Sequence, residues 1–395
     1  MNILFITPRF PFPPIKGDRL RSFYFIRELS KKHTVHLFSF IESCKEREYL
    51  SVLKKYCKNV DVIYLPQWMS ILKMLMNVPM RKPFQISYYY SKEMNKLLRD
   101  VIRNARYDLI HVALIRMAPY IEKMNTIPVI IDHIDCLSLN MERRYKTERG
   151  FLRKSVFKKE WEAMKEYEYR YREVPSIVTS EKDKAALNGY NEIKVISNGV
   201  DLERFQYTYN GDTVKDIDIL FVGNMGYFPN EQAMAYFFNS IYSILKNFKK
   251  NLRVYVVGSN PVRKIRALSD NLNVFVTGFV EDVRRYFYRA KVFIAPLQSG
   301  SGIQNKILEA MACGVPVVST SIGNSGIGAK DREEIIIADE PENFAVSVLE
   351  ILDSEDKRRS LSCNARKLVE RDFSWGKRGQ ELESFYRRVI SFAKR

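Results

Sequence analysis

Residues 295–318 read APLQSGSGIQNKILEAMACGVPVV. Short apolar runs begin and end this stretch at Val292–Ala295 and Val315–Ser319, and such runs are typical of strands buried in a parallel sheet. Gly-Ser-Gly at 300–302 predicts a turn, and apolar residues at helical spacing predict a helix over Gln304–Ala312. The stretch therefore predicts a strand–helix–strand unit of an α/β fold.

The same alternation extends over the whole chain. In the first half we expect strands at Ile3–Ile6, Val35–Phe40, Val60–Leu65, Leu109–Val112, Val129–Asp132 and Ile177–Thr179. In the second half the remaining strands are expected at Ile217–Val222, Val254–Val257, Val274–Thr277 and Ile335–Ile337, with further helices at Glu231–Phe248, Asp282–Arg289, Glu342–Leu352 and Trp375–Ala393. The pattern predicts two doubly wound, Rossmann-like domains at residues 1–190 and 191–372, and a helix over 373–395 that packs back across them. Ligands of such sheets bind at the carboxyl ends of the strands, so we expect the site in a cleft between the domains.

Composition and charge narrow the classes of function. With 46% hydrophobic and 28% charged residues in 395, the chain is globular and long enough for two domains. The start at Met1–Ile6 has an apolar run without a basic segment, and no run reaches the length of a membrane-spanning helix, so we expect a cytoplasmic protein. Five scattered cysteines indicate reduced thiols and no thiolate metal site. The net charge of +18 favours anionic partners: nucleotide phosphates, an acidic membrane surface or nucleic acid.

The turn and helix at 300–312 have the chemistry of a phosphate site. The first amides of a helix are free to bind an anion, and glycines let the backbone approach it closely. Lys306 can add a full charge beside a pyrophosphate, and Glu309, about one turn further on, can accept both hydroxyls of a ribose. The alternative is an ordinary strand-to-helix turn on which both side chains are merely solvated.

Two places in the first domain are further candidates. Gly17 follows the first strand and can let its loop reach a bound phosphate or a second ligand, or it can simply mark a turn. Asp132, His133 and Asp135 end the fifth strand, where an imidazole or carboxylate can orient a substrate hydroxyl or stabilise developing positive charge. The alternative for these three residues is a structural role.

Several motifs together resemble one enzyme family. The run Gly300–Val318, with Val195–Asp201, Leu220–Met225 and Val276–Val280, is similar to the donor-site landmarks of family 4 retaining glycosyltransferases of the GT-B fold. More narrowly, four segments resemble the sugar transferases associated with bacterial exosortase (PEP-CTERM) systems: Pro11–Ser22, Asp132–Asp135, Tyr227–Asn230 and Gly302–Lys306.

The resemblance implies roles for individual residues. Glu309 takes the place of the second Glu of the family's Glu-x7-Glu motif, which holds the ribose, whereas the first Glu is replaced by Ser301. The family's Arg and Lys for the diphosphate have no counterpart in Gly223–Asn230, so Lys306 is the replacement we predict, ahead of Arg263 and Lys264. The predicted catalytic residues are Asp132, His133, Asp135 and Lys306, and the predicted donor-binding residues are Gly17, Gly223, Asn230, Gly300, Ser301, Gly302, Ile303, Gln304, Asn305 and Glu309.

The resemblance also implies an activity. We expect a hexosyltransferase-type enzyme that moves a sugar from a UDP- or GDP-linked donor to a glycan or lipid-linked acceptor in bacterial polysaccharide synthesis (exopolysaccharide, capsule or lipopolysaccharide). We expect no metal site, no further cofactor and no nucleic acid partner. The alternatives left open are a non-catalytic scaffold, another GT-B chemistry such as epimerisation or phosphorolysis, and a basic nucleic-acid-binding protein.

Two stretches bear on membrane contact at the inner face of the plasma membrane. Trp68–Phe84 mixes bulky apolar and basic residues, so it is either an interfacial helix on anionic lipid or a buried helix with a Met-rich core face. The charged stretch Arg143–Arg172 predicts a solvated helix with Trp161 toward the core.

Overall fold

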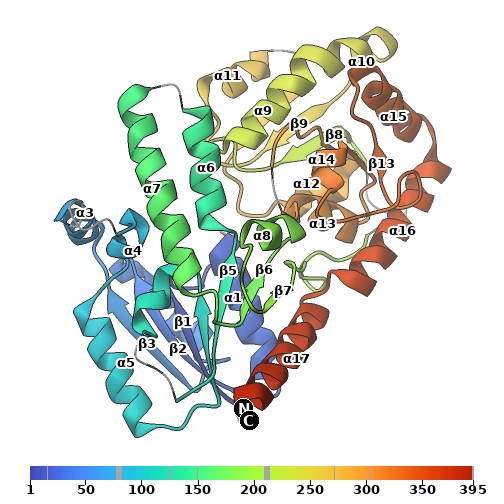
Figure 1. Cartoon of the computed structure of the whole chain (residues 1–395). Coiled ribbons are helices and arrows are strands. Elements are labelled where there is room, and N and C mark those ends of the chain that lie inside the picture. Colours follow the sequence, from blue (N-terminus) through green and yellow to red (C-terminus); the bar gives the residue numbers. More distant parts are fainter. Residues whose placement is uncertain are drawn as a thin grey trace. The chain divides into compact units, whose positions relative to one another are not determined.

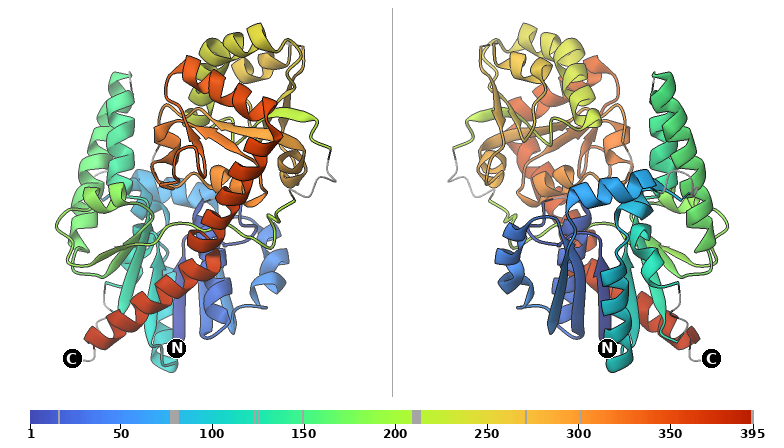
Figure 2. Two further views of the ribbon diagram at one scale, coloured as in Figure 1. Left: turned by 90° about the vertical axis from the view of Figure 1, so that its right-hand side faces the viewer. Right: turned by 90° about the vertical axis from the view of Figure 1, so that its left-hand side faces the viewer.

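The computed structural model describes residues 1–393 apart from 16, 77–81, 123, 125, 149, 209–213, 271 and 301. The chain forms two compact units, Met1–Ser197 with Trp375–Arg395 (unit 1) and Asn198–Ser374 (unit 2). Each unit is built on its own parallel sheet with helices around it (Figures 1 and 2). The prediction of two doubly wound α/β domains is therefore confirmed, and the cleft between them stays a prediction.

Unit 1 contains a seven-stranded parallel sheet of order β3-β2-β1-β4-β5-β6-β7. Its strands are β1 (Asn2–Thr7), β2 (Thr34–Ile41), β3 (Asn59–Tyr64), β4 (Leu109–Ala113), β5 (Val129–Ile134), β6 (Ser176–Val178) and β7 (Ile193–Val195). Six of them lie within two residues of the expected runs. The seventh, β7, is only three residues long and half-buried throughout, so its run is too short to stand out.

Helices surround this sheet. They are α1 (Gly17–Ser30), η1 (Cys44–Tyr49), α2 (Leu50–Leu53), α3 (Gln67–Met76), α4 (Phe84–Tyr88), α5 (Lys92–Asn104), η3 (Ile115–Tyr120), α6 (Leu137–Thr147), α7 (Phe151–Arg170), α8 (Glu181–Ala186) and α17 (Trp375–Ala393). The single helix expected over Arg143–Arg172 is wrong: α6 ends at Thr147, α7 begins after the extended N-cap Gly150, and the two helices form an antiparallel pair (Figure 1). Trp161 is only half-buried and stacks on Tyr145 of α6.

Alternate residues of β1 supply the two cores of unit 1. Ile3 and Phe5 pack on one face with residues of α1 and α17, whereas Leu4 and Ile6 pack on the other face. Trp375, 2% exposed, stacks on Tyr24 of α1 with ring centroids 4.9 Å apart. Burial of a large aromatic side chain contributes roughly 2–3 kcal/mol, which explains why the last helix of the chain folds with the first domain.

The segment around α3 bears on the two alternatives for Trp68–Phe84. Trp68 is 67% exposed, and Ile71 and Leu72 are half exposed, so these apolar side chains of α3 face away from the core. Residues 77–81 lie outside the described part of the chain. Among the described helices, none is long and apolar enough to cross a bilayer.

Unit 2 contains a six-stranded parallel sheet of order β10-β9-β8-β11-β12-β13. Its strands are β8 (Ile217–Val222), β9 (Val254–Val257), β10 (Val274–Gly278), β11 (Ala290–Ala295), β12 (Val317–Ser319) and β13 (Ile336–Ile337). Its helices are α9 (Phe228–Tyr236), the π-helical η4 (Phe237–Ile241), α10 (Tyr242–Phe248), α11 (Arg263–Arg266), η5 (Ala267–Asp270), α12 (Arg284–Arg289), α13 (Asn305–Ala312), α14 (Ser321–Asn324), α15 (Pro341–Asp353) and α16 (Glu355–Asp372). A π-helical turn interrupts the helix expected over Glu231–Phe248, and α16 was not among the expected helices.

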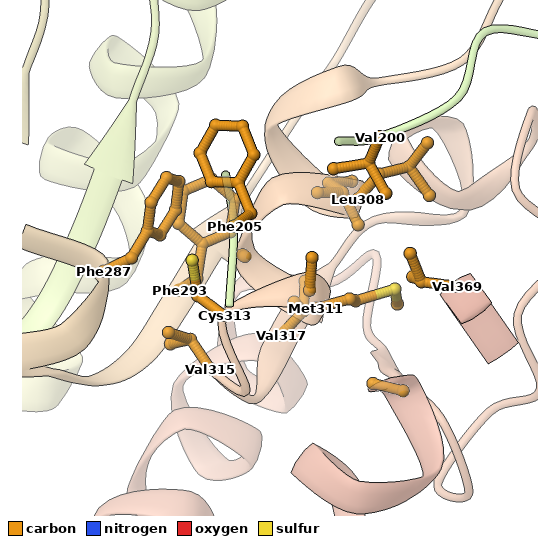
Figure 3. Packing of buried hydrophobic residues seen from close by; sticks show 14 of the residues in the cluster. Val200, Phe205, Phe287, Phe293, Leu308, Met311, Cys313, Val315, Val317 and Val369 are labelled. Carbon is orange, nitrogen blue, oxygen red and sulfur yellow. The ribbon is translucent and has the colours of Figure 1, made fainter. Parts of the chain in front are cut away.

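The core of unit 2 fixes the orientation of α13. Ile307, Leu308 and Met311 pack in a buried cluster with Phe205, Phe287 and Phe293 (Figure 3). Because these apolar residues turn one side of α13 to the sheet, Lys306 and Glu309 are left half-buried on its other side.

Candidate functional site

The candidate site lies where the strand order of unit 2 reverses direction. β8 pairs with β9 on one side and with β11 on the other, so the connections that follow β8 and β11 lead away in opposite directions. A crevice at the carboxyl ends of the strands forms at such a switch point. The segments there are the loop 223–227 after β8 and the loop 296–304 that leads into α13.

The first turn of α13 offers unbonded amides. Gln304 is the N-cap, and its side chain makes no capping hydrogen bond. Its carbonyl accepts from the amide of Ile307 at 2.9 Å, while the amides of Asn305 and Lys306 have no hydrogen-bond partner among the described residues. The helix dipole adds positive potential at this end, so an anion is the natural ligand.

Lys306 is held over the loop that follows β8. Its Nζ donates to the Asn230 side-chain oxygen and lies 4.8 Å from the centroid of the Phe221 ring. Asn230 in turn donates through Nδ2 to the carbonyl of Asn224 at 2.9 Å. Burial lowers the pKa of Lys306 to about 7, and the nearby carboxylate of Glu309 only partly opposes this shift. The ammonium therefore lacks the strong counter-charge that a diphosphate would supply.

The Glu309 carboxylate accepts no hydrogen bond from the described residues. Burial raises its pKa to about 7, against the opposing charges of Arg204 and Lys306. Arg204 was not among the predicted residues, since it stands in an exposed turn of unit 2 far away in sequence and carries no motif. A carboxylate held in this state can accept the hydroxyl groups of a sugar.

Close backbone contacts build the floor of the site. A Cβ on Gly258, whose φ is +143°, would lie 1.8 Å from the carbonyl oxygen of Gly223. A Cβ on Gly326 would lie 2.6 Å from the carbonyl oxygen of Gly302. Glycine is required at both positions, because any side chain would push apart the loops that carry the site.

The other residues predicted to bind the donor belong to the same region of unit 2. Gly300 and Gly302 have φ values of 151° and 70°, and Ile303 packs against the core beneath α13. Ser301, the position of the missing Glu, lies outside the described residues. Unit 2 thus brings together Gly223, Asn230, Gly300, Gly302, Ile303, Gln304, Asn305, Lys306 and Glu309. Arg263 and Lys264 are exposed at the start of the short helix α11.

The residues predicted in unit 1 have other partners. Asp132 is fully buried and accepts from Arg21 Nε at 2.6 Å; burial raises its pKa, although Arg21 opposes the shift. His133 is also fully buried, its Nε2 lies 3.4 Å from the Ser176 hydroxyl, and burial lowers its pKa to about 3. Both side chains are occupied in packing within unit 1, which the sequence could not reveal.

Asp135 is half-buried and Gly17 is exposed to solvent. Burial and the neighbouring carboxylate of Asp183 raise the pKa of Asp135 to about 6, so this group can exchange a proton near neutral pH. Gly17 begins α1, and a Cβ there would meet nothing within 4 Å. These residues lie in unit 1 and the donor-site set lies in unit 2, so their catalytic and binding roles stay predictions.

One carboxylate pair at metal-ligand spacing lies elsewhere in unit 2. Asp216 and Asp218 form an Asp-x-Asp sequence, but they lie at the amino end of β8, away from the loops of the site. Asp216 pairs with Arg289, and Asp218 pairs with Lys291. Within the described part of the chain, no three His, Cys, Asp or Glu side chains are grouped to hold a metal ion.

Comparisons with known proteins point to one class of enzyme. Residues 216–354 match the family model for glycosyl transferases group 1. An uncharacterized 44.6 kDa protein in the cps region of Klebsiella pneumoniae is 21% identical over 392 residues, 94% of this chain and 96% of that protein. The capsular polysaccharide biosynthesis glycosyltransferase CapM of Staphylococcus aureus is 26% identical over 212 residues, 50% of this chain and 55% of CapM.

Solved structures share the fold over nearly the whole chain. Sucrose-phosphate synthase of Thermosynechococcus elongatus has a TM-score of 0.68 at 16% identity and covers 99% of both chains. Anabaena HepE in complex with UDP-glucose has a TM-score of 0.65 at 14% identity, over 97% of this chain and 98% of HepE. The match at residues 216–354 and the glycosyltransferase relatives support a transferase enzyme, and the two-unit fold is that of the GT-B glycosyltransferases among the solved structures.

Proposed function

We propose that the chain is a retaining glycosyltransferase of family 4 that transfers a sugar from a UDP- or GDP-linked donor to a glycan or lipid-linked acceptor. The observation that carries this proposal is the placement of Lys306 and Glu309 on the open side of α13 at the switch point of unit 2. The diphosphate would bind the free amides of the first turn and Lys306, and the ribose hydroxyls would bind Glu309. The complex of HepE with UDP-glucose supports a nucleotide-sugar donor.

The reaction needs stabilisation of a leaving diphosphate. As the glycosidic bond breaks, negative charge grows on the phosphate oxygens, and groups that meet this charge lower the barrier. In the proposed site those groups are the helix amides near residues 303–306 and the Lys306 ammonium, and we propose that no metal or other cofactor is needed. Ser301 replaces the carboxylate that would contact the donor sugar in the family, so sugar selection would depend on other residues.

The relatives support a role in making bacterial surface polysaccharides. One is encoded in a cps region, and another is named for capsular polysaccharide biosynthesis. The narrower assignment to exopolysaccharide synthesis with an exosortase system remains part of the proposal.

We also propose that α3, with Trp68, Ile71 and Leu72 exposed, rests on an anionic membrane and brings the enzyme to a lipid-linked acceptor. If the variant W68S/I71S floats with phosphatidylglycerol vesicles as the wild type does, this contact is refuted.

Thermal unfolding with UDP or GDP tests the donor site. A ligand at 100 times its Kd stabilises the native protein by about 2.7 kcal/mol. For a domain of the size of unit 2 this corresponds to a rise in Tm of roughly 5–10 °C. We expect such a rise with one of the two nucleotides, a much smaller rise in Glu309→Gln, and the full rise in the control Glu342→Gln, whose side chain is exposed on α15 outside the predicted site. Equal rises in all three proteins would place the nucleotide elsewhere.

Turnover tests the reaction itself. With UDP- or GDP-sugars and a lipid-linked oligosaccharide acceptor, we expect release of the nucleoside diphosphate and a product that keeps the anomeric configuration of the donor. An inverted product would contradict the retaining mechanism. Conversion of the donor sugar into an epimer without acceptor would favour the epimerase alternative.

A further inference from the structure

A second concave site lies in unit 1, apart from the donor-site loops. A groove of about 870 Å³ runs between α5, η3 and the end of α7. Its lining includes Lys82, Tyr90, Arg99, Arg103, Glu122 and Arg170. Four of these side chains are cations and one is an anion, and the proposed transfer reaction uses none of them.

The bases of α5 stand in a row along one side of the helix. Asn95, Arg99 and Arg103 follow one another at intervals of four residues, and all three line the groove. Arg99 and Arg103 are both exposed, and neither has an ion-pair or hydrogen-bond partner among the described residues. Like charges four residues apart destabilise a helix by roughly 0.2–0.5 kcal/mol, so an anion between them would relieve a cost that the free protein carries.

Glu122 is the carboxylate among the described lining residues of the groove. It accepts a hydrogen bond from the Tyr171 hydroxyl, a neutral donor, at 2.9 Å. Arg170, on the far side of the groove, pairs with the exposed Glu166 at 2.7 Å. The excess positive charge of the groove therefore comes from Arg99, Arg103 and Lys82, and Glu122 offsets part of it.

A tyrosine ring forms a rigid flat surface in the same groove. Tyr90 is 37% exposed, and its ring stacks on that of Tyr120 with centroids 6.0 Å apart and an angle of 13°. The Tyr120 hydroxyl donates to the carbonyl of Tyr89 at 2.6 Å and accepts from the amide of Ser91 at 2.7 Å. Lys73 of α3 donates to the carbonyl of Tyr90 at 3.0 Å. Both rings are thus fixed in place before any ligand arrives.

We propose that this groove binds a carboxylated oligosaccharide. The planar guanidinium groups of Arg99 and Arg103 match carboxylates in a bidentate manner, and the exposed face of Tyr90 can support the C–H face of a sugar ring. The amide of Asn95 can exchange hydrogen bonds with hydroxyls. A neutral glycan would leave the bases unpaired, and a flat bilayer cannot enter a concave groove.

This inference deepens the proposed function and rests on it. An enzyme that builds an acidic polysaccharide gains affinity for its acceptor if a second site holds sugars remote from the reacting end. The groove would then select acceptors by charge, while the loops of unit 2 select the nucleotide.

Calorimetric binding of oligogalacturonate, with one carboxylate on each sugar, tests the proposal. We expect binding to the wild type, no detectable binding of neutral maltohexaose, and about tenfold weaker binding of oligogalacturonate to R99S/R103S. Each lost ion pair accounts for roughly a two- to fivefold change. The matched control is K54S/K55S, which removes the same charge from an exposed turn after α2 and should bind like the wild type. The variant Y90A should also bind more weakly.

Three results would overturn the inference. The first is equal weakening by R99S/R103S and K54S/K55S, which would indicate attraction to the net charge alone. The second is no binding of oligogalacturonate. The third is tighter, Arg99-dependent binding of phosphatidylglycerol vesicles or of oligouridylate, which would make the groove a lipid or RNA site. UDP-induced thermal stabilisation, measured on the same preparations, reports separately on the donor site and on folding of each variant.

Discussion

The lowered pKa of Lys306 leads to a prediction whose sign depends on pH. Replacement of Lys306 by Met should stabilise the free protein in acid and destabilise it in base. In the folded protein the pKa is about 7, against about 10.4 for an unfolded lysine. A lysine with a lowered folded pKa destabilises the protein most below the folded value, and this cost disappears as the pH rises to the unfolded value.

The size of the effect follows from the surroundings of the ammonium. A difference of about three pKa units corresponds to about 4–5 kcal/mol at pH 6 as an upper bound. Because Lys306 is half-buried, water screens the charge, and we take about half of this value. Met cannot replace the hydrogen bond to Asn230, worth about 1 kcal/mol. The net gain at pH 6 is therefore about 1–2 kcal/mol, or a rise in Tm of roughly 4 °C.

Differential scanning calorimetry at pH 6 and pH 10 checks this reasoning. At pH 10 the cost of the buried charge is nearly gone, so the variant should unfold about 1 kcal/mol more easily than the wild type. The control is Lys264→Met, an exposed lysine of α11, which should change little at either pH. Destabilisation of the Lys306 variant by the same amount at both pH values would show that its ammonium is not buried at a cost.

Three further changes probe the site and its support. Glu309→Gln should weaken UDP or GDP binding about tenfold or more, because a hydrogen bond to a charged group is worth roughly 1.5–3 kcal/mol; isothermal titration measures it. Gly326→Ala should lower both nucleotide affinity and Tm, since the added methyl would lie 2.6 Å from the Gly302 carbonyl oxygen. The control is Gly376→Ala in α17, where the added methyl would make no close contact. Asp132→Asn should lower the free energy of unfolding by about 3–5 kcal/mol in urea titrations, because it removes the carboxylate that pairs with the buried Arg21 guanidinium. A smaller loss would contradict the buried ion pair.

Hydrophobic pattern was sufficient to predict most of the fold. β8 and β9 begin and end at the predicted residues, because each is a continuous apolar run between polar turns. The helix α17 was likewise predicted at both ends. The break between α6 and α7 was missed, since charged residues on both sides hide the change of direction at Gly150.

The site was predictable where neighbours in sequence are neighbours in space. Lys306 and Glu309 lie on one helix, so their spacing alone placed them on a common side. The contact of Lys306 with Asn230 joins residues 76 positions apart, and the pair Arg21–Asp132 joins residues 111 positions apart. No periodicity in one sequence reveals such pairs, which is why Asp132 was expected at an open rim and is instead buried.

Hydrogen exchange measured by mass spectrometry tests most directly whether a diphosphate binds at the start of α13. With UDP or GDP bound, amide exchange in a peptide over residues 300–309 should slow markedly, and this protection should be lost in Glu309→Ala at the same nucleotide concentration. Saturating nucleotide that protects other segments and leaves residues 303–306 exchanging at their free rate would contradict the assignment.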